Sequence, residues 1–562
     1  MILVASSLPE ENFSDFAVVV VGAGAVGVAL AARLASRVGR IALVEAGGPK
    51  LEARVQKQYF KPDRVSDPRH PSTELYRRRM LGGTTSVWGG RCIPLDREDY
   101  SSSLRAPAWP IPYEEVAPWM DDALQFLHAG HDDFSIDVLP ESARSPAVDG
   151  IRDPDLELDR IERFSEPTNV WRRWGQTLVK SQNIVVLQGA ACTNIRTDAD
   201  GRRAVGIDLR TDEGRSIKIN ASAVVLACGG LETPRLLLAS RDRLSCGLGN
   251  ENDLVGRYYM THLGGTTGFL KLRDPGANRC FDYATTSDGV YGRRLIRLTP
   301  EARKRENIAN MVFRPNIHTI FDPSHGDSIL SAMAFAKKLV IPEYSRKLFF
   351  GETEGARSAV LMRHGRNIAG GLPRLASFGF DWLRRRTFAT RKLPSVFLLR
   401  SDATYPIAFD AEQSPDFNSR VSLGPNRDPN GVPRLDIQWR VDDVDLNSIA
   451  RGYHVLKKAA ERAGLGRVDF EHEIIADLRE AVGPVGGHHM GTTRMGSDPK
   501  TSVTDGNGEL WNTKGVFVAG SALFPATGFA NPTLTAVALG LRMADHLLKN
   551  LAGRRAAAEA RM

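Results

Sequence analysis

An uninterrupted run of apolar residues and glycine extends from Phe16 to Ala32, and its internal pattern changes halfway. Its first part, Ala17–Val21, consists of small and β-branched residues, which is typical of a buried strand. A glycine-rich turn follows, then helix-forming residues from Ala25 onward and a second apolar run at Ile41–Val44. The pattern therefore predicts a strand–helix–strand unit. Because acidic rather than basic residues precede the run, we expect neither a signal peptide nor a transmembrane helix.

Three later segments repeat this pattern of buried strands and helices. Ile184–Leu187 and Ala223–Ala227 predict two strands, and the second is followed by two glycines and a helix with Pro234 at its first position. Near the end of the chain, Gly515–Ala519 predicts a strand and Pro532–Leu548 an amphipathic helix. We expect these segments to join the same sheet as the first unit.

Between about residues 264 and 481 the pattern changes to one of alternation and turns. Apolar and polar residues alternate in Leu435–Arg440, so one face of this predicted strand is buried. With Arg420–Leu423 it forms a predicted hairpin, because the turn-forming residues Asp428–Gly431 lie between the two strands. This region is therefore expected to be built on an antiparallel sheet.

The predicted fold is of the α/β class, with a Rossmann-like nucleotide-binding domain and an inserted α+β domain built on an antiparallel sheet. We assign residues 1–95, 170–263 and 482–562 to the discontinuous nucleotide-binding domain. Residues 96–169 and 264–481 are assigned to the inserted domain, which is expected to bind the substrate.

Composition excludes several classes of protein. With 562 residues, 42% of them hydrophobic and 25% charged, the chain matches ordinary globular proteins rather than disordered or fibrous ones. Its five cysteines are scattered and form no C-x-x-C pair, so we expect no disulfide framework, no metal site and a reducing, cytoplasmic location. A net charge of +8 is too small at this length to indicate nucleic-acid binding.

Most of the excess positive charge lies in one segment, residues 361–393. Eight basic residues stand there against one acidic residue, Asp381, which gives the segment a net charge of +7. Apolar and aromatic residues are interleaved with the arginines, a composition suited to an anionic membrane or to an acidic electron-acceptor protein. The alternative is a solvated, partly helical surface excursion. The helix-breaking residues of the segment favour this alternative: Gly370, Gly371, Pro373 and Gly379.

The glycine-rich turn after the first strand has the spacing G-x-G-x-x-G. Gly22 permits the tight turn, Gly24 lets the backbone approach a pyrophosphate, and Gly27 allows close packing of the helix. The following helix offers unpaired N–H groups and the positive end of its dipole to the phosphates. Glu45 ends the second strand, where its carboxylate is placed to accept hydrogen bonds from a ribose. Together these features predict a dinucleotide site, although a glycine-rich turn without a ligand has the same local pattern.

A second glycine-rich segment, LGGTTSVWGG at residues 81–90, follows this unit. Four glycines and several small hydroxyl residues in ten positions suggest backbone lying against a flat or charged ligand. From composition alone, an ordinary glycine-rich loop is the alternative.

Two further motifs lie in the last eighty residues: GGHHMGTTRMG at 486–496 and AGSALFPATGFANPTLT at 519–535. Taken in order with G-x-G-x-x-G and LGGTTSVWGG, they resemble the glucose-methanol-choline (GMC) family of FAD-dependent oxidoreductases. The residues of the two later motifs are most similar to those of bacterial family members that act on sugars or glycosides. The middle of the chain carries no matching motif.

The resemblance assigns the role of base to His488 and that of its partner to Asn531. Imidazole suits removal of a hydroxyl proton because its reference pKa lies near neutrality, while the flavin N5 accepts the hydride. An amide donates a hydrogen bond to the substrate oxygen but takes no proton. Without the resemblance, His488 would be interpreted as a polar loop residue and Asn531 as a helix N-cap. The side chain of the adjacent His489 is expected to point elsewhere.

The resemblance also implies the residues that contact FAD. Val87 stands where several relatives carry a histidine that binds the flavin covalently, so we expect non-covalent FAD. Ala519 replaces an aspartate, so the backbone of the next two residues should contact the flavin. The expected cofactor contacts are Gly22, Gly24, Gly27, Glu45, Gly82, Gly83, Thr84, Trp88, Ala227, Gly520, Ser521, Pro532 and Thr533.

The sequence thus predicts FAD-dependent oxidation of an alcohol, with a carbohydrate or glycoside as substrate. The expected electron acceptor is oxygen, a quinone or a redox protein, and no nucleic-acid partner is expected. Three alternatives stay open: an NAD-dependent dehydrogenase, a flavin-dependent lyase, and a non-catalytic flavin-binding subunit. The first shares the G-x-G-x-x-G turn but does not explain the later motifs.

Overall fold

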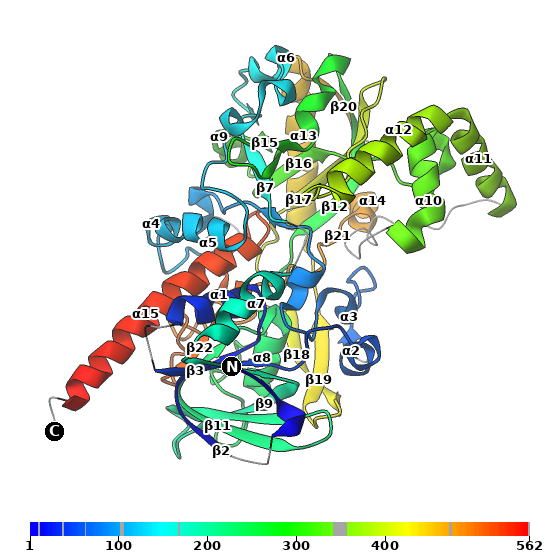
Figure 1. Ribbon diagram of the computed structural model, residues 1–562. Coiled ribbons are helices and arrows are strands. Elements are labelled where there is room, and N and C mark those ends of the chain that lie inside the picture. Colours follow the sequence, from blue (N-terminus) through cyan, green and yellow to red (C-terminus); the bar gives the residue numbers. More distant parts are fainter. Residues whose placement is uncertain are drawn as a thin grey trace.

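The computed structural model describes residues 1–559, apart from 9–11, 36, 38, 62, 102–105, 167–168, 341–356 and 471–474. Two large sheets occupy opposite ends of the molecule (Figure 1). One is assembled from the first, middle and last parts of the chain, and the other mainly from residues 263–484. Among the described residues, no helix is long and apolar enough to cross a bilayer.

The first sheet has eight strands and a parallel core. Its central strand, β2 (Asn12–Val21), pairs in parallel with β3 (Arg40–Glu45) and with β11 (Ser216–Leu226). The order is β1-β8-β3-β2-β11-β10-β9, and β22 also pairs in parallel with β11. The remaining strands are β1 (Ile2–Val4), β8 (Ile184–Gln188), β9 (Ala190–Thr197), β10 (Ala204–Thr211) and β22 (Val516–Val518). The predicted α/β sheet is confirmed, including the strand contributed by the C-terminal segment.

Helices cover this sheet, and the start of one of them, α8, differs from the prediction. The covering helices include α1 (Ala25–Leu34), α7 (Val170–Lys180), α8 (Gly229–Ala239) and α15 (Thr533–Glu559). Because α8 begins at Gly229, Pro234 lies inside the helix, and its predicted position at the first turn is wrong. Proline cannot donate to the carbonyl four residues earlier, that of Gly230. The hydroxyl of Thr492 donates to this carbonyl instead, at 2.7 Å.

The second sheet has seven antiparallel strands in the order β20-β12-β17-β16-β15-β6, with β21 also paired to β12. Helix α13 (Asp443–Arg462) buries its apolar face against this sheet, and Tyr453 is fully buried at the contact. The strands are β6 (Leu156–Glu157), β12 (Leu263–Leu272), β15 (Ile296–Leu298), β16 (Met311–Pro315), β17 (Thr404–Ala411), β20 (Gly466–Asp469) and β21 (Gly483–Pro484). The predicted antiparallel sheet is therefore also confirmed.

The predicted hairpin forms but belongs to a separate small sheet. β18 (Arg420–Arg427) and β19 (Pro433–Gln438) are antiparallel, and β19 pairs in parallel with β4 (Arg64–Val65). A strand from the predicted inserted domain thus pairs with one from the predicted nucleotide-binding domain. The domain limits stay a prediction, and this hairpin is the point where the two predicted domains share a sheet.

Three helices form an arm that projects from the body, on the right in Figure 1: α10 (Ser328–Val340), α11 (Arg357–Gly370) and α12 (Leu372–Trp382). A short π-helical turn (Leu383–Thr387) continues α12. The helical conformation is interrupted at Gly371, between α11 and α12, as the glycines predict, whereas Gly379 lies inside α12. The basic segment is therefore an ordered helical excursion.

Candidate active site

A large cavity opens at the carboxyl ends of β2, β3 and β11, where ligands bind in open α/β sheets. Eleven of the thirteen expected cofactor contacts line it: Gly22, Gly24, Glu45, Gly83, Thr84, Trp88, Ala227, Gly520, Ser521, Pro532 and Thr533. The other two, Gly27 and Gly82, lie behind this lining. A Cβ on Gly27 would lie 1.9 Å from the carbonyl oxygen of Gly22, so glycine there permits close packing of α1.

The turn before α1 is shaped to hold a ligand against its backbone. Gly22 has φ +103°, a conformation that favours glycine. A Cβ on Gly24 would meet no atom within 4 Å, so this glycine faces open space. Ala25 and Val26 line the cavity at the N-terminus of α1, where the first N–H groups have no intrahelical acceptor. These donors and the helix dipole suit the pyrophosphate of a dinucleotide.

Glu45 closes the next edge of the cavity. Its carboxylate accepts hydrogen bonds from the backbone N–H groups of Ala23 and Gly47, each at 3.0 Å. Burial raises the pKa of Glu45 to about 7, and these N–H donors oppose the shift. The carboxyl group is therefore fixed in position and lies near its titration point at neutral pH.

The LGGTTSVWGG segment lies directly over the glycine turn. Gly82 has φ +91°, and its N–H donates to the carbonyl of Ala23 at 2.9 Å. A Cβ on Gly83 would lie 3.1 Å from the Cα of Gly24, so the two backbones touch. Thr84 and Trp88 extend the cavity wall from this segment.

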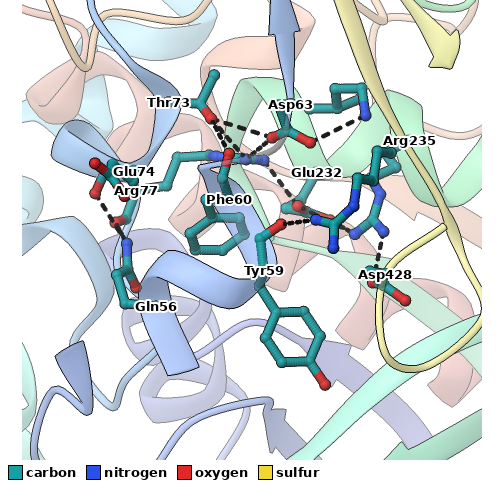
Figure 2. Close-up of polar contacts among 12 residues, drawn as sticks. Gln56, Tyr59, Phe60, Asp63, Thr73, Glu74, Arg77, Glu232, Arg235 and Asp428 are labelled. Carbon is teal, nitrogen blue, oxygen red and sulfur yellow. Dashed lines mark hydrogen bonds and ion pairs between the residues drawn. The ribbon is translucent and has the colours of Figure 1, made fainter. Parts of the chain in front are cut away.

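The sequence prediction missed a set of charged residues around the same cavity (Figure 2). Arg77 forms ion pairs with Asp63 and with Glu232, the latter at 2.8 Å. Arg235 pairs with Glu232 at 3.1 Å and with Asp428 at 2.6 Å. The network joins the segment after α2 (Ala53–Phe60), helix α8 and the turn of the β18–β19 hairpin. No single sequence motif indicates this ion-pair network, because its members come from distant parts of the chain.

Electrostatics hold this network together in a buried setting. Burial alone would lower the pKa of Arg235, but Glu232 and Asp428 more than offset this effect and raise the pKa above its ordinary value. Burial would likewise raise the pKa of Glu232, yet Arg235 and Arg77 lower it. Glu232 and Arg235 therefore stay charged at neutral pH, and the ion pair of Arg235 with Asp428 holds the hairpin turn beside the cavity.

The histidine motif and Asn531 meet beside this cavity. His488 lies between the cavity-lining residues Gly487 and His489, and its Nε2 lies 3.1 Å from Nδ2 of Asn531. Its Nδ1 lies 2.8 Å from Nδ1 of a residue that the sequence did not indicate, His262. The two residues that the resemblance paired, 43 positions apart in sequence, are thus in direct contact.

Strand register explains why His262 faces His488. Met260 and Met490 form an antiparallel bridge, with hydrogen bonds in both directions at 3.0 and 2.9 Å. Two residues further along one segment therefore lie opposite two residues back along the other. His262 is a lone histidine in the sequence, so only this pairing reveals its position.

Donors and acceptors in this chain fix one tautomer of His488. The carbonyl of Thr527 can only accept, so Nε2 of His262 carries the proton and donates to it at 3.2 Å. Burial lowers the pKa of His262, which keeps the ring neutral and leaves its Nδ1 as an acceptor. His488 must then donate from Nδ1, and its Nε2 carries a lone pair toward Asn531.

Asn531 does not serve as a helix cap. Helix α15 begins at Thr533, and the first intrahelical hydrogen bond runs from the N–H of Ala536 to the carbonyl of Pro532 at 2.9 Å. The predicted N-cap position of Asn531 is therefore wrong by one residue. Its Oδ1 is buried and has no hydrogen-bond partner among the described residues. A buried amide with an unused acceptor suits a site completed by a ligand.

His489 is placed differently from its neighbour. Its ring stacks on that of His70, with centroids 6.4 Å apart and planes 16° from parallel, and it also lines the cavity. A Cβ on Gly230 would lie 2.2 Å from the carbonyl oxygen of His489, so α8 packs directly against this loop. The side chain of His489 thus lies away from the pair formed by His488 and Asn531.

A cluster of charged side chains borders the two histidines on the side of the antiparallel sheet. Arg314 donates to Glu162 at 2.9 Å and to Asp410 at 2.7 Å. Arg91 forms ion pairs with the same two carboxylates at 3.0 and 3.4 Å. Burial would raise the pKa of Asp410, but Arg314 and Arg91 lower it to about 2.

Comparisons with known proteins agree with this geometry. Two family models, both described as GMC oxidoreductase, match residues 166–264 and 415–540. The chain is 24% identical over 533 residues to 2-methyl-1,2-propanediol dehydrogenase of Mycolicibacterium austroafricanum, covering 84% of this chain and 82% of that protein. It is 36% identical over 123 residues to C-glycoside 3-oxidase of Microbacterium trichothecenolyticum, covering only 21% and 22% of the two chains.

Among solved structures, pyridoxine 4-oxidase from Mesorbium loti superposes with a TM-score of 0.54 at 16% identity, covering 95% of this chain and 99% of that one. At this identity the likeness establishes the shared fold. The two matched family models, together with these relatives, identify the chain as a GMC-type oxidoreductase that acts on alcohols, and the family implies FAD as the cofactor.

Proposed function

We propose that this enzyme oxidises a hydroxyl group of a sugar or glycoside, with His488 as general base and Asn531 as hydrogen-bond donor to the substrate oxygen. The observation that carries the proposal is the hydrogen-bonded series from Asn531 through His488 and His262 to the carbonyl of Thr527. With the tautomer inferred above, Nε2 of His488 is an unprotonated nitrogen beside an amide donor, next to the cavity-lining residues Gly487 and Pro532.

The residues of the cavity suit FAD. The turn at Gly22–Gly24 and the N-terminus of α1 would hold the pyrophosphate, and Glu45 the ribose hydroxyls. Gly520 and Thr533 also line the cavity and would contact the flavin. When bound, FAD supplies the acceptor for the hydride of the alcohol carbon. Because Val87 offers no nucleophile, we propose that FAD is held non-covalently.

The two side chains near the substrate have separate tasks. Nε2 of His488 accepts the hydroxyl proton, and the resulting imidazolium keeps donating from Nδ1 to His262. Nδ2 of Asn531 donates to the oxygen as negative charge develops on it. Helix α15 begins two residues after Asn531, so the positive end of its dipole favours negative charge near this amide.

The charged cluster beside the histidines supports a substrate with several hydroxyl groups. Arg314, Arg91 and Asp410 lie close to His262, because Oδ1 of Asp410 is 3.2 Å from a Cβ placed on Gly264, two residues after His262. Polar side chains so close to the histidines favour a ligand that can hydrogen-bond with them over an apolar alcohol. Two relatives described as C-glycoside 3-oxidase and one described as fructose dehydrogenase large subunit agree with this substrate class.

Anaerobic mixing of the flavin-loaded enzyme with glycosides, polyols, simple diols and sterols tests the proposal. We expect bleaching of the flavin by glycosides or sugars. Bleaching by simple diols alone would overturn the substrate class, and no bleaching by any alcohol would overturn the oxidoreductase role. Repeating the reactive cases with oxygen, a quinone and a redox protein identifies the acceptor. Acid precipitation should release all the flavin into the supernatant, whereas retained flavin would contradict non-covalent binding.

His488→Ala tests the base. The variant should bind FAD normally but lose at least ~100-fold in the rate of flavin reduction, the lower range for loss of a general base. An unchanged reduction rate in a fully loaded variant would contradict the assignment.

A further inference from the structure

We propose that the outer part of the arm, residues 357–393 with helices α11 and α12, docks on an anionic lipid surface. This proposal is independent of the substrate proposed above. It concerns a face of the molecule that neither the cofactor cavity nor the two histidines use.

The arm exposes several large apolar side chains to solvent, where they do not contribute to the core of the protein. Among the described residues, the three most exposed large apolar side chains all lie here: Phe388, Phe380 and Met362, at 80%, 73% and 66%. Leu361, Leu372 and Leu383 on the same segment are also exposed. Exposed apolar side chains gathered in this way mark a surface that contacts another body.

Helix α12 carries two apolar faces, of which only one is used. Leu375 and Phe378 pack against the small apolar cluster under the arm, and Trp382 packs against the core of the antiparallel sheet. Leu372 and Phe380 of α12 are exposed instead, and so is Leu383 in the π-helical turn that follows. A surface helix normally presents polar residues on its outer face.

Cations accompany these apolar side chains. The net charge of residues 361–393 is +7, and Arg363, Arg366, Arg384 and Lys392 are exposed. Arg384 pairs with Asp381 at 2.9 Å, and Asp381 is the only acidic residue of this segment. Apolar side chains that enter the acyl boundary, beside arginines that reach phosphate groups, are the pattern of an interfacial helix on anionic lipid.

The arm is attached firmly enough to present this face. The ring of His364 on α11 is buried and bonded to the hydroxyl of Ser331 at 3.0 Å on α10. Arg391 donates to the carbonyls of His128 and Phe164, at 3.0 and 3.3 Å, on the body of the protein. The exposed side chains therefore stand on a fixed support.

Charge and apolar exposure together favour lipid over a protein partner. Two copies of this chain meeting through the same face would bring two segments of +7 together, which repel each other. An acidic protein would satisfy the arginines but would not require phenylalanines with 73% and 80% exposure. A bilayer with anionic headgroups satisfies both.

Co-sedimentation of the FAD-loaded, full-length protein with vesicles tests the proposal. We expect binding to vesicles that contain phosphatidylglycerol and little binding to phosphatidylcholine alone. The double variant Phe380→Ser/Phe388→Ser should weaken partitioning at least ~10-fold, because both rings are lost from the interface. A matched control, Phe269→Ser/Val444→Ser, removes apolar side chains of 40% and 50% exposure elsewhere and should bind like the wild type.

Arg363→Gln/Arg366→Gln tests the charge. Loss of two cations near an anionic surface should weaken partitioning about 10- to 30-fold, and added salt should weaken the wild type similarly. Arg64→Gln/Arg467→Gln, which removes two side chains with 77% and 75% exposure elsewhere, serves as the control for net charge. All variants should keep wild-type flavin content and activity on a soluble substrate.

Three outcomes would overturn the proposal. The first is absence of binding to anionic vesicles by the wild type. The second is binding that the arginine pair weakens but the phenylalanine pair does not, which would indicate a purely electrostatic surface for an acidic protein. The third is a stable dimer that the phenylalanine pair dissociates, which would assign the face to contact between copies.

Discussion

Replacing His262 tests whether this residue fixes the tautomer of His488 that accepts the substrate proton. The ring is fully buried, and its Nδ1 lies 2.8 Å from Nδ1 of His488. In His262→Ala the N–H of His488 at this position loses its acceptor. The neutral ring of His488 is then free to carry its proton on Nε2 instead, and in that tautomer it cannot accept a proton from the substrate.

The magnitude follows from the lost hydrogen bond. A buried donor left without its partner costs about 1–3 kcal/mol. If this cost falls on the reactive tautomer and on the imidazolium formed in the reaction, the rate of flavin reduction drops roughly 5- to 150-fold, since about 1.4 kcal/mol corresponds to tenfold. Binding of substrate and FAD does not use this bond, so KM and flavin content should change little.

Anaerobic stopped-flow absorbance measures the reduction rate directly. His262→Gln, which offers an amide oxygen as acceptor, should recover part of the loss. His454→Ala, which removes an exposed histidine of α13, is the matched control and should react like the wild type. A wild-type reduction rate in a fully loaded His262→Ala enzyme would refute the role assigned to this residue.

Three further predictions concern the cofactor cavity. Gly24→Val should leave the fold intact, because a Cβ there meets no atom within 4 Å, but should abolish FAD binding; a yellow variant would contradict this. Burial raises the pKa of Glu45 from 4.5 to about 7, so the folded apoprotein binds an extra proton between these values, and its unfolding free energy should fall by roughly 3 kcal/mol as pH rises through this range. Urea unfolding at pH 5 and pH 8 should show this slope in the wild type and not in Glu45→Gln. Asp428→Ala leaves Arg235 without one of its carboxylates and should lower the unfolding free energy by about 3–5 kcal/mol, measured in the same way; a loss below 1 kcal/mol would contradict a buried pair.

The elements that the sequence predicted correctly are those that neighbouring residues specify. The strand–turn–helix around Gly22–Gly27 and the hairpin turn at Asp428–Gly431 are specified by neighbouring residues, and the structure confirms both. The contact between His488 and Asn531 was expected from the resemblance, and the structure places the two side chains together.

The features that the sequence did not predict depend on contacts between residues far apart in the chain. His262 reaches His488 only through the register of Met260 with Met490, and a lone histidine carries no sign of that register. The β18–β19 hairpin pairs with β4, a strand of two residues that has no detectable periodicity. Asn531 looks like a helix cap from its neighbours, whereas the structure directs its side chain to another part of the chain.

Pro234 has a consequence for the order in which the enzyme assembles during synthesis. By leaving the carbonyl of Gly230 unoccupied, it keeps an attachment point on α8 for Thr492, a residue made 262 positions later. The carbonyl of Gly230 is therefore made in the first half of the chain and can accept this hydrogen bond only after Thr492 has been made. His488 and Asn531 are made late as well, so a chain that stops before residue 482 lacks both the residues that we assign to proton transfer and the C-terminal part of the cavity lining.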